Sequence, residues 1–150
     1  MTDHFQRIVL ASRPIGEVTP NDFRLETVPV PAINDGQVLI RNHFLSLDPY
    51  MRVRMDDVKN YAAPQALNET MIGGTVGEIV ASKNPQFQIG DKVIGMMGWA
   101  EMGVSDGALL RKLDTTHIPL SAYLGGGGMP GTTARYGWAQ IMQANEGETS

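Results

Sequence analysis

The feature of this sequence that most limits its fold is a series of short apolar runs punctuated by glycine and proline. These strand-like runs cover residues 7–12, 23–31, 36–47, 73–82, 91–100 and 108–113. Pro14 and Gly16 follow the first run, and the pairs Gly73-Gly74 and Gly90-Asp91 introduce the fourth and fifth. Frequent short strands with turn residues between them are typical of a barrel or a sandwich rather than of alternating strand–helix units. The sequence therefore predicts a mainly β (α+β) domain.

Two further segments are predicted to be helical. Asp48-Pro49 indicates the start of a short helix, because aspartate can cap a helix and proline suits its first position. A second helix is predicted to begin near Thr132-Thr133, either of which can cap it, and apolar residues then recur at three- and four-residue steps between Ala134 and Met142. Residues 61–68, which are rich in proline and alanine, are predicted to form a surface loop.

The composition excludes several classes of function. The net charge of −4 does not favour nucleic-acid binding, which usually needs a clustered basic surface. The absence of cysteine excludes disulfides, thiolate nucleophiles and sulfur-ligated zinc. The three histidines are far apart in sequence, so a histidine–carboxylate metal site assembled by the fold is the remaining and less favoured metal hypothesis. We expect a cytoplasmic protein without membrane contact, because the sequence shows neither a long apolar span nor a signal-peptide pattern.

Four motifs resemble a known family. They are "SLDPYMRVRM" (Ser46–Met55), "IGGTVGEIVAS", "GDKVIG" and "GMPGTTARYGW" (Gly128–Trp138), in the family's order and spacing. Together they resemble the zinc-independent medium-chain dehydrogenase/reductase superfamily, and within it the alkenal, prostaglandin and curcumin reductase branch. The resemblance covers nearly the whole chain.

The resemblance implies a fold and a reaction. The fold is a GroES-like, partly open β-barrel with a few short helices and a C-terminal helix, so residues 1–150 are expected to form the catalytic domain and the Rossmann domain is expected to lie outside this chain. The reaction is NADPH-dependent hydride transfer to the C=C bond of an α,β-unsaturated ketone, aldehyde or quinone, in a homodimeric parent enzyme. Zinc is expected to be absent, since zinc-containing relatives have Gly-His-Glu where this chain has Gly73-Gly74-Thr75. The isolated domain is expected to be inactive.

Tyr50 is the candidate catalytic residue. Reduction of an enone places negative charge on its carbonyl oxygen, and a phenol can donate a hydrogen bond there while neutral at pH 7. The resemblance implies that Tyr50 lines the substrate pocket, whereas the residues alone also allow it to pack a short helix onto the barrel. Asp48 either orients the pocket or caps the helix, with capping the simpler interpretation. Arg52 and Arg54 either meet phosphates or an acidic substrate, or form a solvated helix face.

The glycine run Gly125–Gly128 is not interpreted as the dinucleotide fingerprint, which follows a strand, opens a helix and has an acidic partner about 20 residues later. The resemblance implies that this loop approaches the nicotinamide ring, with Met129 beside the ring and Thr133 near its carboxamide. Pro49 is the third expected cofactor-binding residue. A flexible tether before the last helix is the alternative interpretation of the glycines.

The family's site residues transfer less directly to this loop than to Tyr50, and a second hypothesis on function stays open. Gly126-Gly127 and Arg135 depart from the family pattern, which has bulky apolar residues at the first two positions and an aromatic or small residue at the third. A GroES-like barrel can also serve as a non-enzymatic binding or interaction module, because fold does not fix function.

Overall fold

The computed structural model describes residues 3–58, 63–143 and 147. The strands are β1 (His4–Leu10), β2 (Phe23–Pro29), β3 (Val38–Leu45), β4 (Thr75–Ser82), β5 (Lys92–Gly95), β6 (Met102–Ser105) and β7 (Arg111–Lys112). The helices are η1 (Pro20–Asp22), α1 (Tyr50–Met55), η2 (Leu120–Leu124), α2 (Met129–Tyr136) and η3 (Gly137–Met142). The prediction of a mainly β fold with short helices is confirmed.

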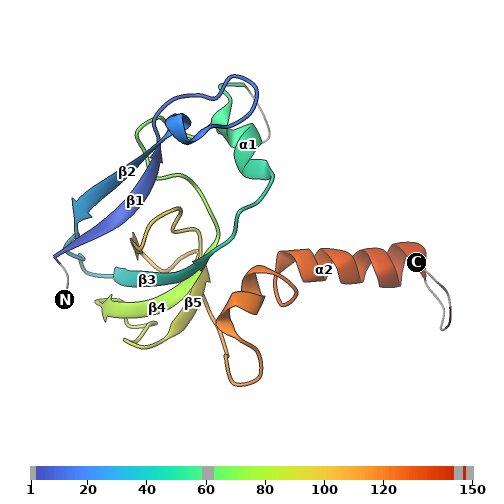
Figure 1. Cartoon of the computed structure of the whole chain (residues 1–150). Coiled ribbons are helices and arrows are strands. Elements are labelled where there is room, and N and C mark those ends of the chain that lie inside the picture. The colour runs from blue at the N-terminus through green and yellow to red at the C-terminus, as the bar shows by residue number, and fades with distance from the viewer. Residues whose placement is uncertain (1–2, 59–62, 144–146, 148–150) are drawn as a thin grey trace.

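Two antiparallel sheets form a partly open barrel (Figure 1). Strands β1 and β2 make a two-stranded ribbon, and the other five are ordered β6-β3-β4-β5-β7. Single bridges from Arg7 to Ala100 and from Val9 to Thr70 join the ribbon to segments that flank the larger sheet. The barrel is therefore held together at these bridges, without a continuous ladder around it.

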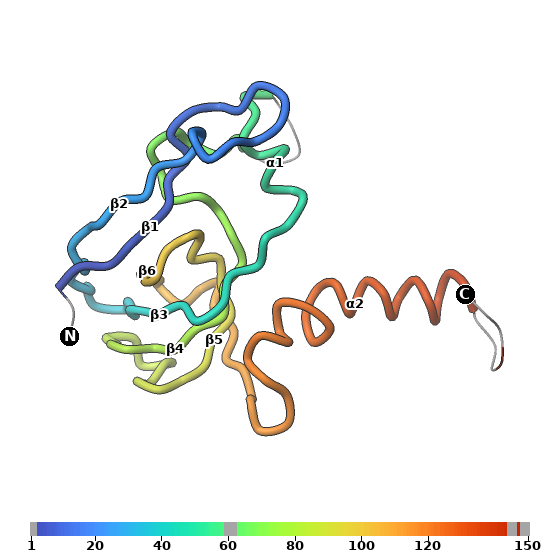
Figure 2. The backbone as a smooth tube through the Cα atoms, viewed as in Figure 1, coloured from blue at the N-terminus to red at the C-terminus, as the bar shows by residue number. Residues whose placement is uncertain are grey.

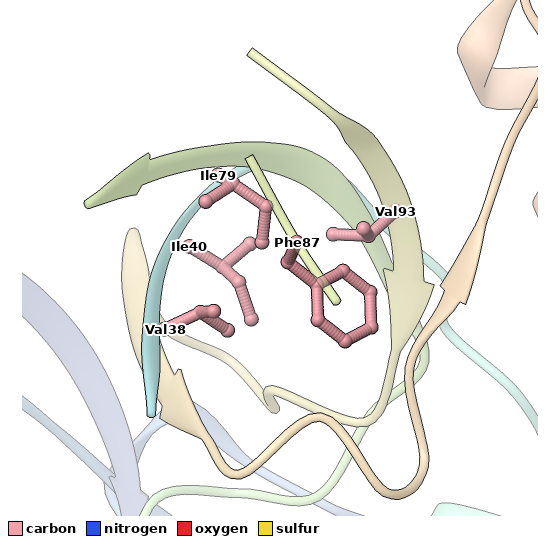
Figure 3. Close-up of a cluster of buried hydrophobic side chains, with 5 residues drawn as sticks. All are labelled: Val38, Ile40, Ile79, Phe87 and Val93. Carbon is pink, nitrogen blue, oxygen red and sulfur yellow. The ribbon is translucent and has the colours of Figure 1, made fainter. Parts of the chain in front are cut away.

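The hydrophobic core is divided into two clusters. One fills the curve of the larger sheet, where the side chains of Val38, Ile40, Ile79, Phe87 and Val93 point toward one another (Figure 3). The other packs α1 onto the β1 end of the barrel and consists of Leu10, Met51, Met55 and Met71. Complete burial of each such side chain contributes about 1.5–3 kcal/mol. This packing fixes the position of α1, whose first residue is Tyr50.

The C-terminal helices leave the barrel. Helix α2 and the π-helical turn η3 extend outward as one rod (Figure 2). None of their described residues is buried, and the apolar side chains of Tyr136, Trp138 and Ile141 are 61%, 46% and 69% exposed.

The helix starts differ from the predictions. Helix α1 has Pro49 at its N-cap and no side-chain cap, because the Asp48 carboxylate instead accepts a hydrogen bond from Ser46 Oγ at 3.0 Å. Helix α2 begins at Met129, not near Thr132-Thr133. Both threonine hydroxyls donate back to carbonyls four residues earlier, at 3.0 and 2.9 Å, so neither serves as a cap.

Two of the predicted strands are much shorter in the structure, and of the run 108–113 only Arg111–Lys112 forms a strand, β7. The run 91–100 forms a strand only to Gly95. Beyond the end of the strand, Gly98 has a φ of +76° and approaches the carbonyl of Met71 so closely that a Cβ atom would lie 2.5 Å from that oxygen. Strand β6 was not predicted at all. Of the predicted loop 61–68, residues 61 and 62 lie outside the described part, and the remainder is not purely a surface loop because Gln65 is buried.

Candidate active-site cleft

A cleft of about 620 Å³ lies between one end of the larger sheet and the start of α2. The strand register explains why its walls meet, since Leu45 pairs with Thr75 and Thr75 pairs with Gly95. The end of β3, the beginning of β4 and the end of β5 therefore share one edge of the sheet. Strand β7 continues this edge through the pairing of Ile94 with Arg111. The loop between η2 and α2 forms the facing wall.

Tyr50 lines this cleft and also contributes to the core. Its half-buried side chain packs against the cluster that contains Met51 and Met55, so packing and pocket lining coexist in one residue. Asp48 and Ser46 line the same wall, joined by their side-chain hydrogen bond. The packing of α1 on the core thus places the Tyr50 side chain at the cleft.

The two arginines of α1 do not line the cleft. Arg52 is paired with Asp56 at 2.7 Å and donates to the carbonyl of Gly16 at 2.8 Å. Arg54 has a buried Nε atom that makes no hydrogen bond with any described residue. Neither side chain forms part of the wall that faces Met129.

The glycine run is folded into hydrogen-bonded turns. The N–H groups of Gly125 and Gly127 donate to the carbonyl of Ala122 at 3.0 and 2.8 Å, and that of Gly128 donates to the carbonyl of Gly125 at 2.9 Å. A Cβ atom on Gly128 would lie only 2.1 Å from the carbonyl oxygen of Tyr123. The flexible-tether interpretation is therefore wrong. The turns follow η2 rather than a strand, so they are not the dinucleotide fingerprint, as the sequence indicated.

Of the three predicted cofactor-binding residues, only Met129 lines the cleft. Met129 is 72% exposed and lines the cleft opposite the wall that carries Tyr50. Thr133 and Pro49 lie next to lining residues but not in the lining itself, and the Thr133 hydroxyl donates to the carbonyl of Met129. Thr132 lines the cleft in place of its neighbour.

Several lining residues were not predicted from sequence. The apolar ones are Ile94, Met96, Leu109 and Leu124. The cationic one is Arg111, on β7. Of these residues only Ile94 belongs to one of the four motifs, GDKVIG, and the fold rather than a local pattern brings them together at the cleft.

The carboxyl groups with shifted pKa values lie outside the cleft lining. A hydrogen bond from Lys92 lowers the pKa of Glu78, and the backbone N–H of Gln88 lowers that of Asp91. Among the described residues, no group of three histidine or acidic side chains is arranged to hold a metal ion. No described helix is long and apolar enough to cross a membrane.

The chain is similar to known reductases. Residues 6–113 match the family model described as the N-terminal domain of oxidoreductase. The chain is 47% identical to the NADPH-dependent curcumin reductase of Escherichia coli, over 96% of this chain and 42% of that protein. It is 42% identical to prostaglandin reductase 1 of Oryctolagus cuniculus, over 89% of this chain and 37% of that protein. The chain thus spans about two-fifths of the length of these relatives.

A solved structure agrees with these matches. The crystal structure of CurA in complex with NADPH from Vibrio vulnificus has a TM-score of 0.85 and 42% sequence identity. The alignment covers 95% of this chain and 42% of that chain. The resemblance to the curcumin, prostaglandin and alkenal reductase branch, which the sequence motifs indicated, is confirmed.

Proposed function

The chain belongs to the family of oxidoreductase N-terminal domains, and we propose that it forms the substrate-binding wall of an NADP-dependent reductase. The proposed reaction is the reduction of the C=C bond of an α,β-unsaturated ketone or aldehyde by hydride transfer. The names of the relatives support the cofactor and the substrate class. The observation that carries the proposal is that Tyr50 and Met129 line one cleft.

The proposed role of Tyr50 is to donate a hydrogen bond to the substrate carbonyl. Hydride addition at the β-carbon moves the electron pair of the double bond toward that carbonyl and leaves an enolate oxygen. A donor that is already in place stabilises this charge without reorganisation. We propose that the phenol takes the place that a metal ion has in zinc-containing relatives, since this chain has no cysteine and carries Gly74 at a corresponding position.

The cleft also fits a flat cofactor ring. Its volume lies within the roughly 300–1,000 Å³ typical of small-molecule sites. Gly127 and Gly128 form part of one wall, and their lack of side chains lets a planar ring approach the backbone closely. NADPH supplies the hydride when it is bound, and we propose Met129 as the contact to its ring. Thr133 and Pro49 stay proposed contacts at the margin of the cleft.

The test is a binding experiment with Tyr50→Phe. We expect a straight-chain enone to bind this variant about three- to tenfold more weakly than the unaltered chain, because one hydrogen bond of about 0.5–1.5 kcal/mol is lost. NMR titration of the labelled chain measures the dissociation constant. Tyr136→Phe is the matched control, because Tyr136 is exposed on α2 and does not line the cleft.

The saturated ketone of the same length provides the second comparison, since an enone carbonyl is the better hydrogen-bond acceptor. Equal affinity of the chain for enone and saturated ketone, together with no effect of Tyr50→Phe, would contradict the proposal and favour a non-enzymatic binding module.

A further inference from the structure

Arg111 is the single basic side chain among the described residues that line the cleft. It lies on β7, at the edge of the larger sheet, and its side chain is exposed. The other contributors to this part of the lining are apolar, including Ile94, Met96 and Leu109. A guanidinium at the rim of an apolar cleft is suited to a ligand that has an apolar body and an anionic end.

Arg111 forms no ion pair with Asp106 or Asp114, the acidic residues nearest to it in sequence, or with Asp91, which directly precedes the neighbouring strand β5. Asp91 is paired with the neighbouring Lys112 at 2.7 Å. The Asp114 carboxylate accepts hydrogen bonds from the hydroxyl and the backbone N–H of Thr116. Within residues 3–58 and 63–143, Arg111 itself forms no ion pair and no side-chain hydrogen bond.

The charges in the cleft are separated along the sheet. Arg111 pairs with Ile94, and Ile94 pairs with Val76. Val76 in turn pairs with Phe44, near the end of β3. Three strand spacings therefore separate Arg111 from β3, a path of roughly 14 Å across the strands of the sheet. Because Asp48 follows β3, the acidic side chain lies at the Tyr50 end of the cleft and the basic one at the other.

We infer that Arg111 determines substrate specificity by binding a carboxylate at the far end of an enone whose carbonyl is at Tyr50. The inference rests on the proposed function and adds the charge and the polarity of the substrate. Asp48 repels an anion from the Tyr50 end, and Arg111 attracts it to the β7 end, so the pair selects one orientation. The apolar side chains between them contact the hydrocarbon chain that connects carbonyl and carboxylate.

The experiment compares a straight-chain enone that carries a terminal carboxylate with its methyl ester. We expect the unaltered chain to bind the acid about fivefold more tightly than the ester at low salt, as for an exposed ion pair. This preference should decrease as the salt concentration rises, because the site is exposed. Arg111→Gln should abolish the preference, and Arg111→Lys should retain part of it. NMR titration gives each dissociation constant, and thermal unfolding checks that each variant is folded.

Lys83→Gln is the matched control, because Lys83 is exposed, lies outside this cleft and changes the net charge by the same amount. It should leave the preference for the acid unchanged. An equal affinity of the unaltered chain for acid and ester would overturn the inference. So would a preference that survives Arg111→Gln.

The outcomes also separate this inference from the proposed function. If Tyr50→Phe weakens both ligands while acid and ester bind equally, the enone site stands and the role of Arg111 is refuted. If the preference for the acid depends on Arg111, but a saturated keto acid binds as well as the enone acid and Tyr50→Phe has no effect, binding of the anion by Arg111 stands and the proposed function is contradicted.

Discussion

The glycines of the run Gly125–Gly128 differ in how closely they are packed, although the sequence does not distinguish them. Gly128 lies against the backbone of Tyr123, whereas the position of a Cβ atom on Gly126 has no neighbour within 4 Å. The run therefore contains one glycine that the packing requires and one that it tolerates. Because Gly126 is one of the positions that depart from the family pattern, the structure gives a local reason why its identity is free.

This difference gives a direct prediction. Gly128→Ala is expected to reduce the free energy of unfolding by about 1–3 kcal/mol, because the new methyl group overlaps a backbone oxygen that cannot rotate away. Gly126→Ala should change it by less than about 0.5 kcal/mol. Urea unfolding followed by tryptophan fluorescence measures both values. Equal stability of the two variants would show that the turn is less tightly packed than described.

A second prediction at this scale concerns acid stability. Glu78 accepts a hydrogen bond from Lys92 and lies 3.6 Å from His43 Nε2, and Arg41 is its strand partner. The pKa of Glu78 is lowered chiefly by Lys92, so the folded state binds its proton at a lower pH than the unfolded state does. Its stabilisation is therefore complete above the ordinary value of 4.5 and is lost as the pH falls further.

Glu78→Gln should accordingly flatten the dependence of unfolding free energy on pH in the acid range. Thermal unfolding at a series of pH values measures that slope. Glu17→Gln serves as the control, because Glu17 is exposed and forms no ion pair with any described residue. An unchanged slope in Glu78→Gln would mean that the carboxylate is equally solvated in both states.

At the scale of elements, local signals predicted those elements whose own sequence determines their structure. The Asp48-Pro49 pair indicated a short helix because proline fixes φ, and α1 begins at the next residue. Strand β6 was not predicted because it is only four residues long and contains a glycine, and its pairing with β3 is what makes it a strand. Tertiary pairing of this kind leaves no periodic signal in the sequence.

The residues of the candidate site likewise differ in whether the local sequence or the tertiary fold identifies them. Tyr50 and Met129 were identified because each belongs to a motif with a recognisable local structure. Arg111 was not, because its place in the cleft depends on the pairing of β7 with β5. Met96 reaches the cleft just beyond the end of β5, and it too belongs to no motif. A cleft wall that is assembled from the ends of separate strands can be predicted only when the pairing register of those strands is known.

The rod formed by α2 and η3 supports a prediction about association. Apolar residues recur along this rod at helical spacing, and Trp138 and Ile141 are exposed in the structure. Exposed apolar surface of this kind favours contact with other molecules. We therefore expect the 150-residue chain to self-associate weakly through this rod, and sedimentation velocity should show an average mass that rises with concentration.

Replacement of Trp138 and Ile141 by glutamine should remove most of this concentration dependence. Gln140→Ala, a change at an exposed polar position between them, should leave it unchanged. Persistent association of the double variant would place the contact surface on the barrel rather than on the rod.

At the scale of the whole molecule, binding and turnover are expected to separate. The cleft has walls from α1, β5, β7 and α2, which is sufficient to bind a small ligand. Cofactor binding needs more, because the described residues hold no strand followed by a glycine turn and a helix, the unit that binds a dinucleotide phosphate. We predict that the 150-residue chain binds an enone but does not oxidise NADPH in its presence. The full-length NADPH-dependent curcumin reductase of Escherichia coli, assayed by the loss of NADPH absorbance, is the positive control. Turnover by the 150-residue chain at a rate similar to that control would show that these residues bind the cofactor without such a unit. The proposed separation of enone binding from NADPH oxidation would then be wrong.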